Sequence, residues 1–263
     1  MTRAFRAELV KLLRRRVLLG TAAACLVFGM GATSLILAAA TPAASAQRGG
    51  PVPTVEGLAV AGGGTDLFRV AMAFAGTFVF VVFVGAMAAE FSRGTFRTML
   101  LREPRRVRLL AGKLAAMLAF AAAALALTET LAWATALWRA PGAGVDTSAW
   151  TSGAGLGAAL TDYGAVLLWV TGYAVLGTTL AVLLRSVPVA LGAGIAWAGP
   201  VEHIVGDAWA PAGRAFPGLL LETFVAGGSA DVSAGRALAT VAAYALVAAV
   251  AAGAVFARRD ITA

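Results

Sequence analysis

The stretch EFSRGTFRTMLLREPRRVRLLAGK, from Glu90 to Lys113, determines the fold expected for this chain. It contains seven basic residues but only two acids, Glu90 and Glu103. Long apolar runs flank it, at about residues 67–89 and 114–138. Under the positive-inside rule, a dense basic segment between two apolar segments of membrane-spanning length stays in the cytoplasm. The stretch therefore predicts two membrane-spanning helices joined on the cytoplasmic side.

A short helix is predicted inside this stretch, from Thr95 to Arg102. Gly94 and Pro104 bracket the segment, and no residue between them would break a helix. The hydroxyl of Thr95 is suited to cap the helix by accepting an orphan backbone N–H. After a turn at Pro104, the chain is expected to return to the membrane at Lys113.

The two faces of this predicted helix differ in polarity. Phe96, Met99 and Leu100 follow the i, i+3, i+4 spacing and form an apolar face, whereas Arg97 and Arg102 lie opposite. An apolar face on a short helix at a membrane surface indicates that a partner docks there. A solvated basic loop that only sets the topology is the alternative interpretation.

The composition is that of a membrane protein. The chain is 60% hydrophobic and 13% charged, with a mean hydropathy of +0.85, whereas soluble domains are about one quarter charged. Its net charge of +8 would suit a nucleic-acid partner. However, the basic residues cluster at the ends of apolar runs, so membrane topology explains them and no nucleic-acid partner is expected. Cys25 is the only cysteine, which excludes disulfide frameworks and cysteine-based metal sites.

We expect an all-α integral membrane protein, with residues 1–263 forming a single transmembrane domain. A chain of this length holds about six spans of roughly 20 residues each. The predicted spans are about 17–40, 67–89, 114–138, 160–184, 189–207 and 236–257. The run AFPGLLLETFVA at 215–226 is apolar but too short to cross a bilayer. It predicts a re-entrant or interfacial external segment between the fifth and sixth spans.

An amphipathic helix is predicted before the first span, at residues 3–16. Its apolar face carries Phe5, Leu9, Leu12 and Leu13, and its opposite face carries Arg3, Lys11 and Arg14. Such a helix lies in the membrane interface, where basic residues are available to anionic headgroups. The three arginines 14–16 and the Ala-Ser-Ala at 44–46 resemble a cleavable signal peptide. The apolar run at 17–40 is longer than a signal core, which favours a retained first span.

The positions of the basic residues support six spans with both termini in the cytoplasm. The predicted cytoplasmic pieces hold six basic residues before Val17, seven in 90–113, one at Arg185 and two at 258–259. These make up 16 of the 21, and the external pieces hold the other five. This asymmetry agrees with the positive-inside rule.

The basic stretch resembles the cytoplasmic loop of ABC-2 type transporter permeases. The resemblance rests on Glu-x3-Gly-Thr-x-Arg, followed by Pro-x-Arg and Leu-x-x-x-Lys. In that family, the loop between the second and third spans contains a coupling helix that seats in a cleft of the ATP-hydrolysing subunit. The resemblance assigns this coupling role to Glu90, Gly94, Thr95, Arg97, Pro104, Arg106 and Lys113, and the apolar face of the short helix adds Phe96, Met99 and Leu100.

The resemblance implies the membrane subunit of a bacterial ATP-driven exporter, without enzymatic activity of its own. The expected partners are a cytoplasmic ATP-binding cassette ATPase, which would carry the ATP and magnesium, a second permease copy in a homodimer or heterodimer, and the lipid of a bacterial plasma membrane. Apolar, alanine-rich spans favour a hydrophobic or amphipathic substrate. The chain itself contains no phosphate-binding loop, because Gly112-Lys113 is followed by Leu114 and lacks the earlier glycine.

Three ionisable residues in or near the apolar runs are candidates for a translocation path: Glu129, Glu202 and His203. Intramembrane charges are costly and often functional, but a structural role in hydrogen bonding and packing within the bundle is favoured here. His203 and Asp207 are spaced to share a helix face. Two further functions stay open. One is an integral membrane enzyme whose catalytic groups would be Glu202, His203 and Asp207, and the other is a non-transporting membrane anchor or immunity protein.

Overall fold

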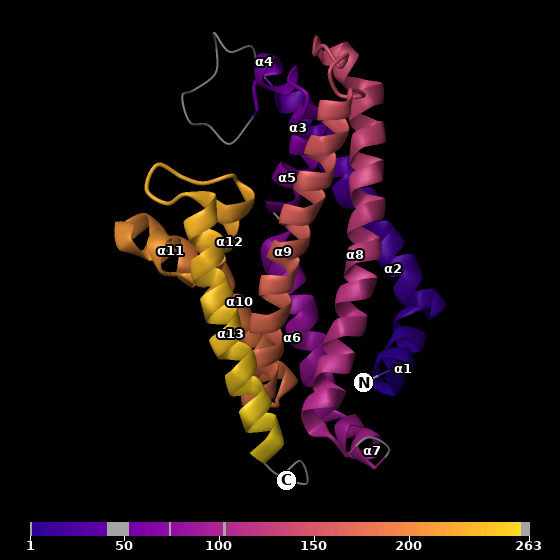
Figure 1. The fold of residues 1–263 in the computed structure, drawn as a ribbon, viewed down its shortest axis with the longest axis vertical. Coiled ribbons are helices and arrows are strands. Elements are labelled where there is room, and N and C mark those ends of the chain that lie inside the picture. Colours follow the sequence, from indigo (N-terminus) through magenta and orange to yellow (C-terminus); the bar gives the residue numbers. More distant parts are fainter. Residues whose placement is uncertain (1, 41–52, 74, 102–103, 259–263) are drawn as a thin grey trace. The chain divides into compact units, whose positions relative to one another are not determined.

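The computed structural model describes residues 2–40, 53–73, 75–101 and 104–258 (Figure 1). Helices make up most of this part of the chain, and no β-strand occurs among the described residues. The predicted all-α class is therefore confirmed. Four features of the sequence analysis lie outside the described residues: the signal-like site at 44–46, Arg102 at the predicted end of the short basic helix, Glu103 and Arg259.

Five helices are long and apolar enough to cross a membrane, and a sixth crossing results if α5 (Gly63–Ala73) and α6 (Gly76–Ser92) count as one span. Together they indicate a multi-pass membrane protein. The five helical spans are Arg15–Ala39, Arg106–Ala143, Gly153–Leu184, Val187–Ala208 and Ala234–Arg258.

The first helix, α1 (Thr2–Leu12), is shorter than predicted. The expected amphipathic helix at 3–16 is wrong at its C-terminal end, because Arg14 has extended backbone angles and α2 (Arg15–Leu26) begins directly after it. The first span then continues through a π-helical turn, η1 (Val27–Ala32), into α3 (Thr33–Ala39). Two of the three arginines at 14–16 therefore form the first turn of the span.

Several helices extend beyond their apolar runs. The third predicted span is α8 (Arg106–Arg139), which begins well before Leu114 and ends in a 3₁₀ turn, η3 (Ala140–Ala143). The fourth is α9 (Gly153–Leu184). Polar and small residues propagate both helices, because arginine and alanine have high helix propensity. The apolar pattern marks the membrane-length part of a helix but not its ends.

The fifth span is interrupted at Gly199-Pro200 by a π-helical turn. The fifth span consists of α10 (Val187–Ala196), η4 (Trp197–Val201) and α11 (Glu202–Ala208). Pro200 lies inside η4, and proline removes a helical N–H, which favours such local irregularity.

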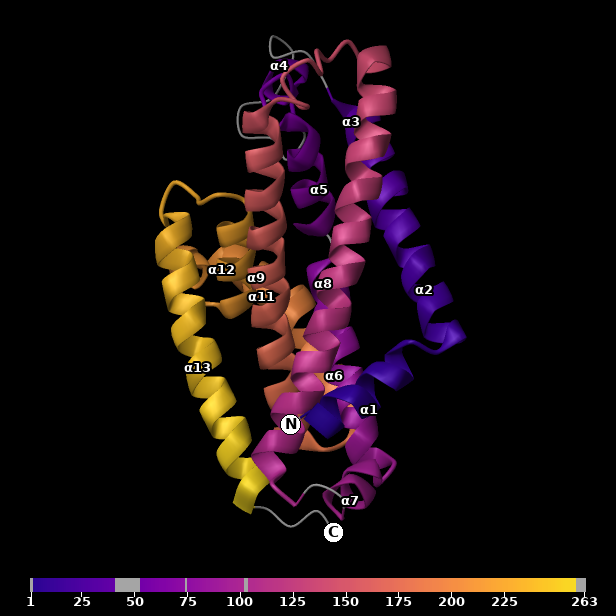
Figure 2. The same ribbon diagram turned by 45° about the vertical axis from the view of Figure 1, so that its right-hand side comes forward.

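The apolar segment at 215–226 folds as a short helix, α12 (Pro217–Val225). A 3₁₀ turn, η5 (Ala210–Arg214), precedes it. Figures 1 and 2 show α12 beside the last helix, α13 (Ala234–Arg258), and the two helices are in contact.

The chain forms two compact units. The first contains Met1–Leu13, Gly76–Phe120 and Leu168–Ala263, and its helices include α1, α6, α10, α12 and α13. Close helix packing within it depends on small residues. A Cβ at Gly194 of α10 would lie 2.9 Å from the Phe80 ring of α6, so a glycine allows the two helices to approach each other.

The second unit contains Arg14–Ala75 and Ala121–Leu167. Its core gathers around Trp150, which is fully buried and whose indole N–H donates a 2.8 Å hydrogen bond to the Leu58 carbonyl at the end of α4 (Val55–Leu58). The other buried members of this core are Leu37, Leu58, Leu67, Ala136, Ala140 and Val145. The bonded indole satisfies the one polar group of a large buried side chain.

Candidate functional site

The short helix in the basic stretch is present as α7 (Thr95–Leu100). It begins at Gly94, which has a left-handed backbone with φ +66°. The prediction that Thr95 caps the helix is wrong. The Thr95 hydroxyl instead donates to the Glu90 carboxylate and lies 3.0 Å from the Glu90 carbonyl oxygen, which anchors α7 to the end of α6.

Phe96 holds α7 against the bundle. Its side chain is fully buried, and its ring centroid lies 4.5 Å from that of Phe91 and 5.1 Å from that of Phe256 on α13. Arg185 covers the Phe91 ring with its guanidinium carbon 5.6 Å from the centroid. Arg106 donates from Nη1 to the Phe256 carbonyl at 3.4 Å. Phe96, the largest residue of the predicted docking face, is therefore buried inside the protein and is not available to a partner.

A closed ring of four charges lies beside α7. We define the charge ring as Glu8 and Lys11 of α1, Glu90 of α6 and Lys113 of α8. The Lys113 ammonium lies 2.5 Å from Glu8 Oε1 and 3.0 Å from Glu90 Oε1. Lys11 completes the ring, at 3.0 Å from Glu90 Oε1 and 3.2 Å from Glu8 Oε2.

The ring is internally neutral and buried at Lys113 and Glu8, whereas Glu90 is 13% exposed and Lys11 is 33% exposed. The Lys113 side chain is only 2% exposed and that of Glu8 is 7% exposed. Two ammonium groups balance two carboxylates, and Thr95 occupies the remaining oxygen of Glu90. Buried charges need such complete pairing, because each would otherwise carry a large desolvation penalty. The ring therefore connects α1 with α6 and α8, which lie much later in the sequence.

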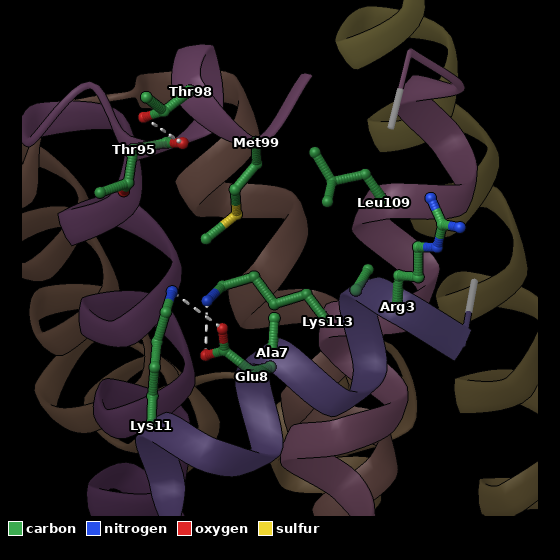
Figure 3. A pocket seen from close by; sticks show the side chains of 10 residues that line it. Arg3, Ala7, Glu8, Lys11, Thr95, Thr98, Met99, Leu109 and Lys113 are labelled. Atoms are coloured by element: carbon green, nitrogen blue, oxygen red, sulfur yellow. Dashed lines mark hydrogen bonds and ion pairs between the residues drawn. The ribbon is translucent and has the colours of Figure 1, made fainter. Parts of the chain in front are cut away.

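A pocket of about 720 Å³ opens next to the ring (Figure 3). Figure 3 shows Lys11 and Lys113 directed at Glu8, while Met99 and Leu109 contribute an apolar part of the wall. Arg3 lies apart from the ring, near Leu109. The complete lining is Arg3, Ala4, Ala7, Glu8, Lys11, Thr95, Thr98, Met99, Leu109 and Lys113.

The outer surface of α7 presents a different set of residues from the predicted one. Arg97 is exposed, whereas Met99 and Leu100 are half-buried. Leu101, which follows the helix, is 84% exposed. Pro104 is also exposed and precedes the start of α8. A partner approaching α7 would therefore meet Arg97 and Leu101 rather than Phe96.

The N-terminal helix agrees only in part with its prediction. Phe5, Leu9 and Leu12 are half-buried and Leu13 is 52% exposed. The expectation that Lys11 is available to lipid headgroups is wrong, because its ammonium is bound by Glu8 and Glu90.

A second polar cluster surrounds Glu202, which is only 1% exposed. Trp197 donates its indole N–H to Glu202 Oε1 at 2.6 Å. Glu202 Oε2 lies against Gly218 in the first turn of α12, where a helix favours negative charge. A Cβ at Gly218 would lie 2.0 Å from Glu202 Oε2, so this approach requires glycine. Glu202 thus joins the fifth span to α12.

His203 pairs differently from the prediction. It lies 3.3 Å from Glu222 Oε1 on α12 and 2.7 Å from the Gly199 carbonyl, whereas Asp207 is exposed. Burial raises the pKa of the Glu222 carboxyl, and the neighbouring His203 opposes that shift. The His203–Glu222 pair is half-exposed and is a second connection between α11 and α12.

Glu129 belongs to the second unit and is half-buried, with no hydrogen bond to its Oε1. Nearby in that unit, Asp162 accepts from Thr65 at 2.7 Å and from Arg69 at 3.2 Å. Among the described residues, no group of three or more His, Cys, Asp or Glu side chains is placed to hold a metal ion.

Sequence reasoning selected Glu90 and Lys113 but missed Glu8 as their partner. Glu8 and Lys113 are 105 residues apart, so no local spacing connects them. One signal was available: Glu8 is the only acid among the first 16 residues, which otherwise carry six basic residues. A lone acid on a strongly basic helix suggests a specific partner.

The comparisons with known proteins identify a family. The model of the family described as "Protein of unknown function (DUF2705)" matches residues 43–197, more than half of the 263-residue chain. The matched region contains Glu90, α7 and Lys113, but not Glu8, Lys11 or Glu202. No curated protein and no solved structure gave a significant match.

Proposed function

This chain belongs to the DUF2705 family, and we propose that it is the membrane-spanning permease subunit of an ATP-driven transporter. The proposed activity is export of a hydrophobic or amphipathic substrate, with ATP hydrolysed by a separate cytoplasmic ATP-binding cassette subunit. In this proposal the chain has no enzymatic activity, and ATP and magnesium bind to the partner subunit.

One observation carries the proposal: α7 exposes Arg97 and Leu101 while it is held to the rest of its unit. The Thr95–Glu90 bond connects it to α6, and Phe96 connects it to α13. A helix held in this way can transmit a push from a docked partner, whereas a loosely attached loop would absorb it. The basic residues of the stretch and its likeness to an ABC-2 coupling loop point the same way.

The proposed mechanism is mechanical. ATP binding and hydrolysis would move α7, and the charge ring and Phe96 would pass this movement to α1, α6, α8 and α13. A partner can shift a conformational equilibrium only if it binds the two states with different affinity. We place that difference at α7, and we expect two permease copies and two ATPase subunits in one assembly.

The proposed location is the plasma membrane of a bacterium, with both termini in the cytoplasm. Glu129, Glu202 and His203 remain candidates for the translocation path. For Glu202 and His203, the bonds to α12 favour a structural contribution, in which they hold α12 against the fifth span.

Coexpression with the ATPase encoded beside the chain tests this function. The two proteins should purify together, and the wild-type permease should change ATP hydrolysis in lipid. Arg97→Glu should reduce either binding or this coupled hydrolysis at least several-fold, because it reverses the exposed charge of α7. Arg139→Glu is the control, since it makes the same change at the far end of α8.

Absence of a complex, or equal behaviour of both variants, would leave the basic stretch as a topology signal only. In that case a non-transporting membrane protein would become the better interpretation. A complex that forms normally but never hydrolyses ATP in response to the permease would favour the anchor function over transport.

A further inference from the structure

The pocket beside the charge ring has the chemistry of a lipid site. We propose that it binds one anionic phospholipid, with the lipid phosphate at the guanidinium of Arg3 and the upper acyl chains against Met99 and Leu109. This binding is independent of the ATPase and does not rest on the proposed transport function.

The level of the pocket points to a membrane lipid. Leu109 and Lys113 lie on the first turns of α8, where the basic segment 105–113 meets the apolar run that begins at Leu114. Such a junction lies at the boundary between the headgroups and the hydrocarbon. Phospholipid phosphates are therefore the anions present at this level at high local concentration.

The charges in the pocket select an anion. The charge ring contributes two positive and two negative groups, so it adds no net charge. Arg3 is exposed and forms no ion pair within the described part of the chain. It leaves the lining with an excess positive charge, and a guanidinium binds phosphate oxygens in a bidentate geometry.

The size and the walls suit part of a lipid. A volume of about 720 Å³ lies within the range of roughly 300–1,000 Å³ typical of small-ligand sites. It can therefore hold a headgroup and the upper parts of the chains rather than a whole lipid. Ala4 and Ala7 of α1 leave room on one side, and Met99 provides an adaptable apolar surface on the other.

The test measures lipid retention by the purified full-length chain without any ATPase. The protein is placed in nanodiscs of phosphatidylcholine mixed with phosphatidylglycerol, and the lipids that remain bound are counted by native mass spectrometry. We expect one retained phosphatidylglycerol in preference to phosphatidylcholine. Arg3→Gln should reduce that preference about fivefold, the effect of one basic residue at an anionic surface.

Two further variants sharpen the test. Arg6 is an exposed arginine on the same helix, but it does not line the pocket. Arg6→Gln should therefore leave the preference for phosphatidylglycerol unchanged. Ala7→Leu fills the pocket without changing any charge and should reduce retention of phosphatidylglycerol. Equal losses in Arg3→Gln and Arg6→Gln would overturn the proposal, because they would indicate diffuse attraction to the whole helix.

A soluble ligand is tested in a separate arm. Inorganic phosphate and glycerol 3-phosphate are added to the same nanodiscs, and neither should displace the retained phosphatidylglycerol. Displacement by either compound would overturn the proposal in favour of a site for soluble phosphate. Absence of any preference between the two lipids in the wild type would overturn it as well.

Discussion

At the residue scale, Lys113 is the critical member of the charge ring. Lys113→Met should reduce the free energy of unfolding by about 3–5 kcal/mol, because it leaves two buried carboxylates with only one ammonium. Denaturant titration in mixed micelles measures this. Arg108→Met, on an exposed site of the same helix, should change stability by no more than about 0.5 kcal/mol.

The partner of Lys113 can be tested by a double variant. Lys113→Met combined with Glu8→Gln removes one positive and one negative charge, which leaves Lys11 and Glu90 paired. The double variant should lose less unfolding free energy than the two single variants lose in sum, as expected for residues in one network. Additive losses would indicate that the two side chains do not interact.

Gly94 is a second position at which a single residue determines local structure. Its φ of +66° strains any residue with a Cβ, although no other atom lies within 4 Å of that Cβ. Gly94→Ala should therefore cost about 1–2 kcal/mol, and Gly94→Asn should cost less because asparagine tolerates this conformation. Thermal unfolding compares them. An alanine variant as stable as wild type would exclude the left-handed backbone.

The candidate site could be predicted from sequence only where its pattern is local. The density of arginines in 90–113 marked Glu90, Gly94 and Lys113 as important. The burial of Phe96 could not be predicted, because its partner Phe256 is 160 positions away and an apolar face looks the same whether a domain or a separate protein covers it. The role of Thr95 was wrong for a similar reason, since Glu90 competes for its hydroxyl.

At the element scale, the inner side of α7 holds the helix in the protein, and its outer side is exposed to a docking partner. Phe96→Ala should destabilise the fold by about 3–5 kcal/mol, the usual cost of removing a buried aromatic side chain. Backbone amides in α7 should then exchange hydrogen faster. Leu101→Ala should leave stability and exchange unchanged because Leu101 is 84% exposed, yet it should weaken ATPase binding.

These paired variants distinguish two functions of one short helix. Should Leu101→Ala destabilise the protein as much as Phe96→Ala, the assignment of an inner and an outer side to α7 would be wrong.

Element types were predicted well and element ends were not. Long runs of apolar residues identify membrane-spanning helices, because in lipid every backbone N–H and C=O must be hydrogen-bonded within the segment. Helix ends depend on local backbone geometry instead. Arg14 interrupts the first helix without any proline or glycine, and α8 begins at Arg106 because nothing after Pro104 opposes a helix. The predicted spans 160–184 and 189–207 leave only a short connection at Arg185, and two residues join α9 and α10 there.

At the scale of the whole molecule, the topology depends on whether α5 and α6 form one crossing. Six crossings put Arg6 and Arg108 on the same side of the membrane, with Val60 on the other. Five crossings would separate Arg6 from Arg108 and put Val60 with Arg108. The distribution of basic residues, with 16 of the 21 in the predicted cytoplasmic pieces, favours six.

Single-cysteine labelling tests this topology. Cys25 is the only native cysteine, so a Cys25→Ser background allows one cysteine to be introduced at a time, in Arg6→Cys, Val60→Cys and Arg108→Cys. A membrane-impermeant thiol reagent added to intact cells should label position 60 alone. Labelling of position 108 together with position 60, or of position 6 alone, would indicate five crossings and contradict the six-span topology.

The charge ring has a consequence for the order in which the protein matures. Glu8 and Lys11 leave the ribosome early, but the ring closes only after Lys113, 105 residues beyond Glu8, has also been synthesised. Until then, α1 lacks its ion pair with α8. A nascent chain arrested before residue 113 would still offer α1 to chaperones and proteases.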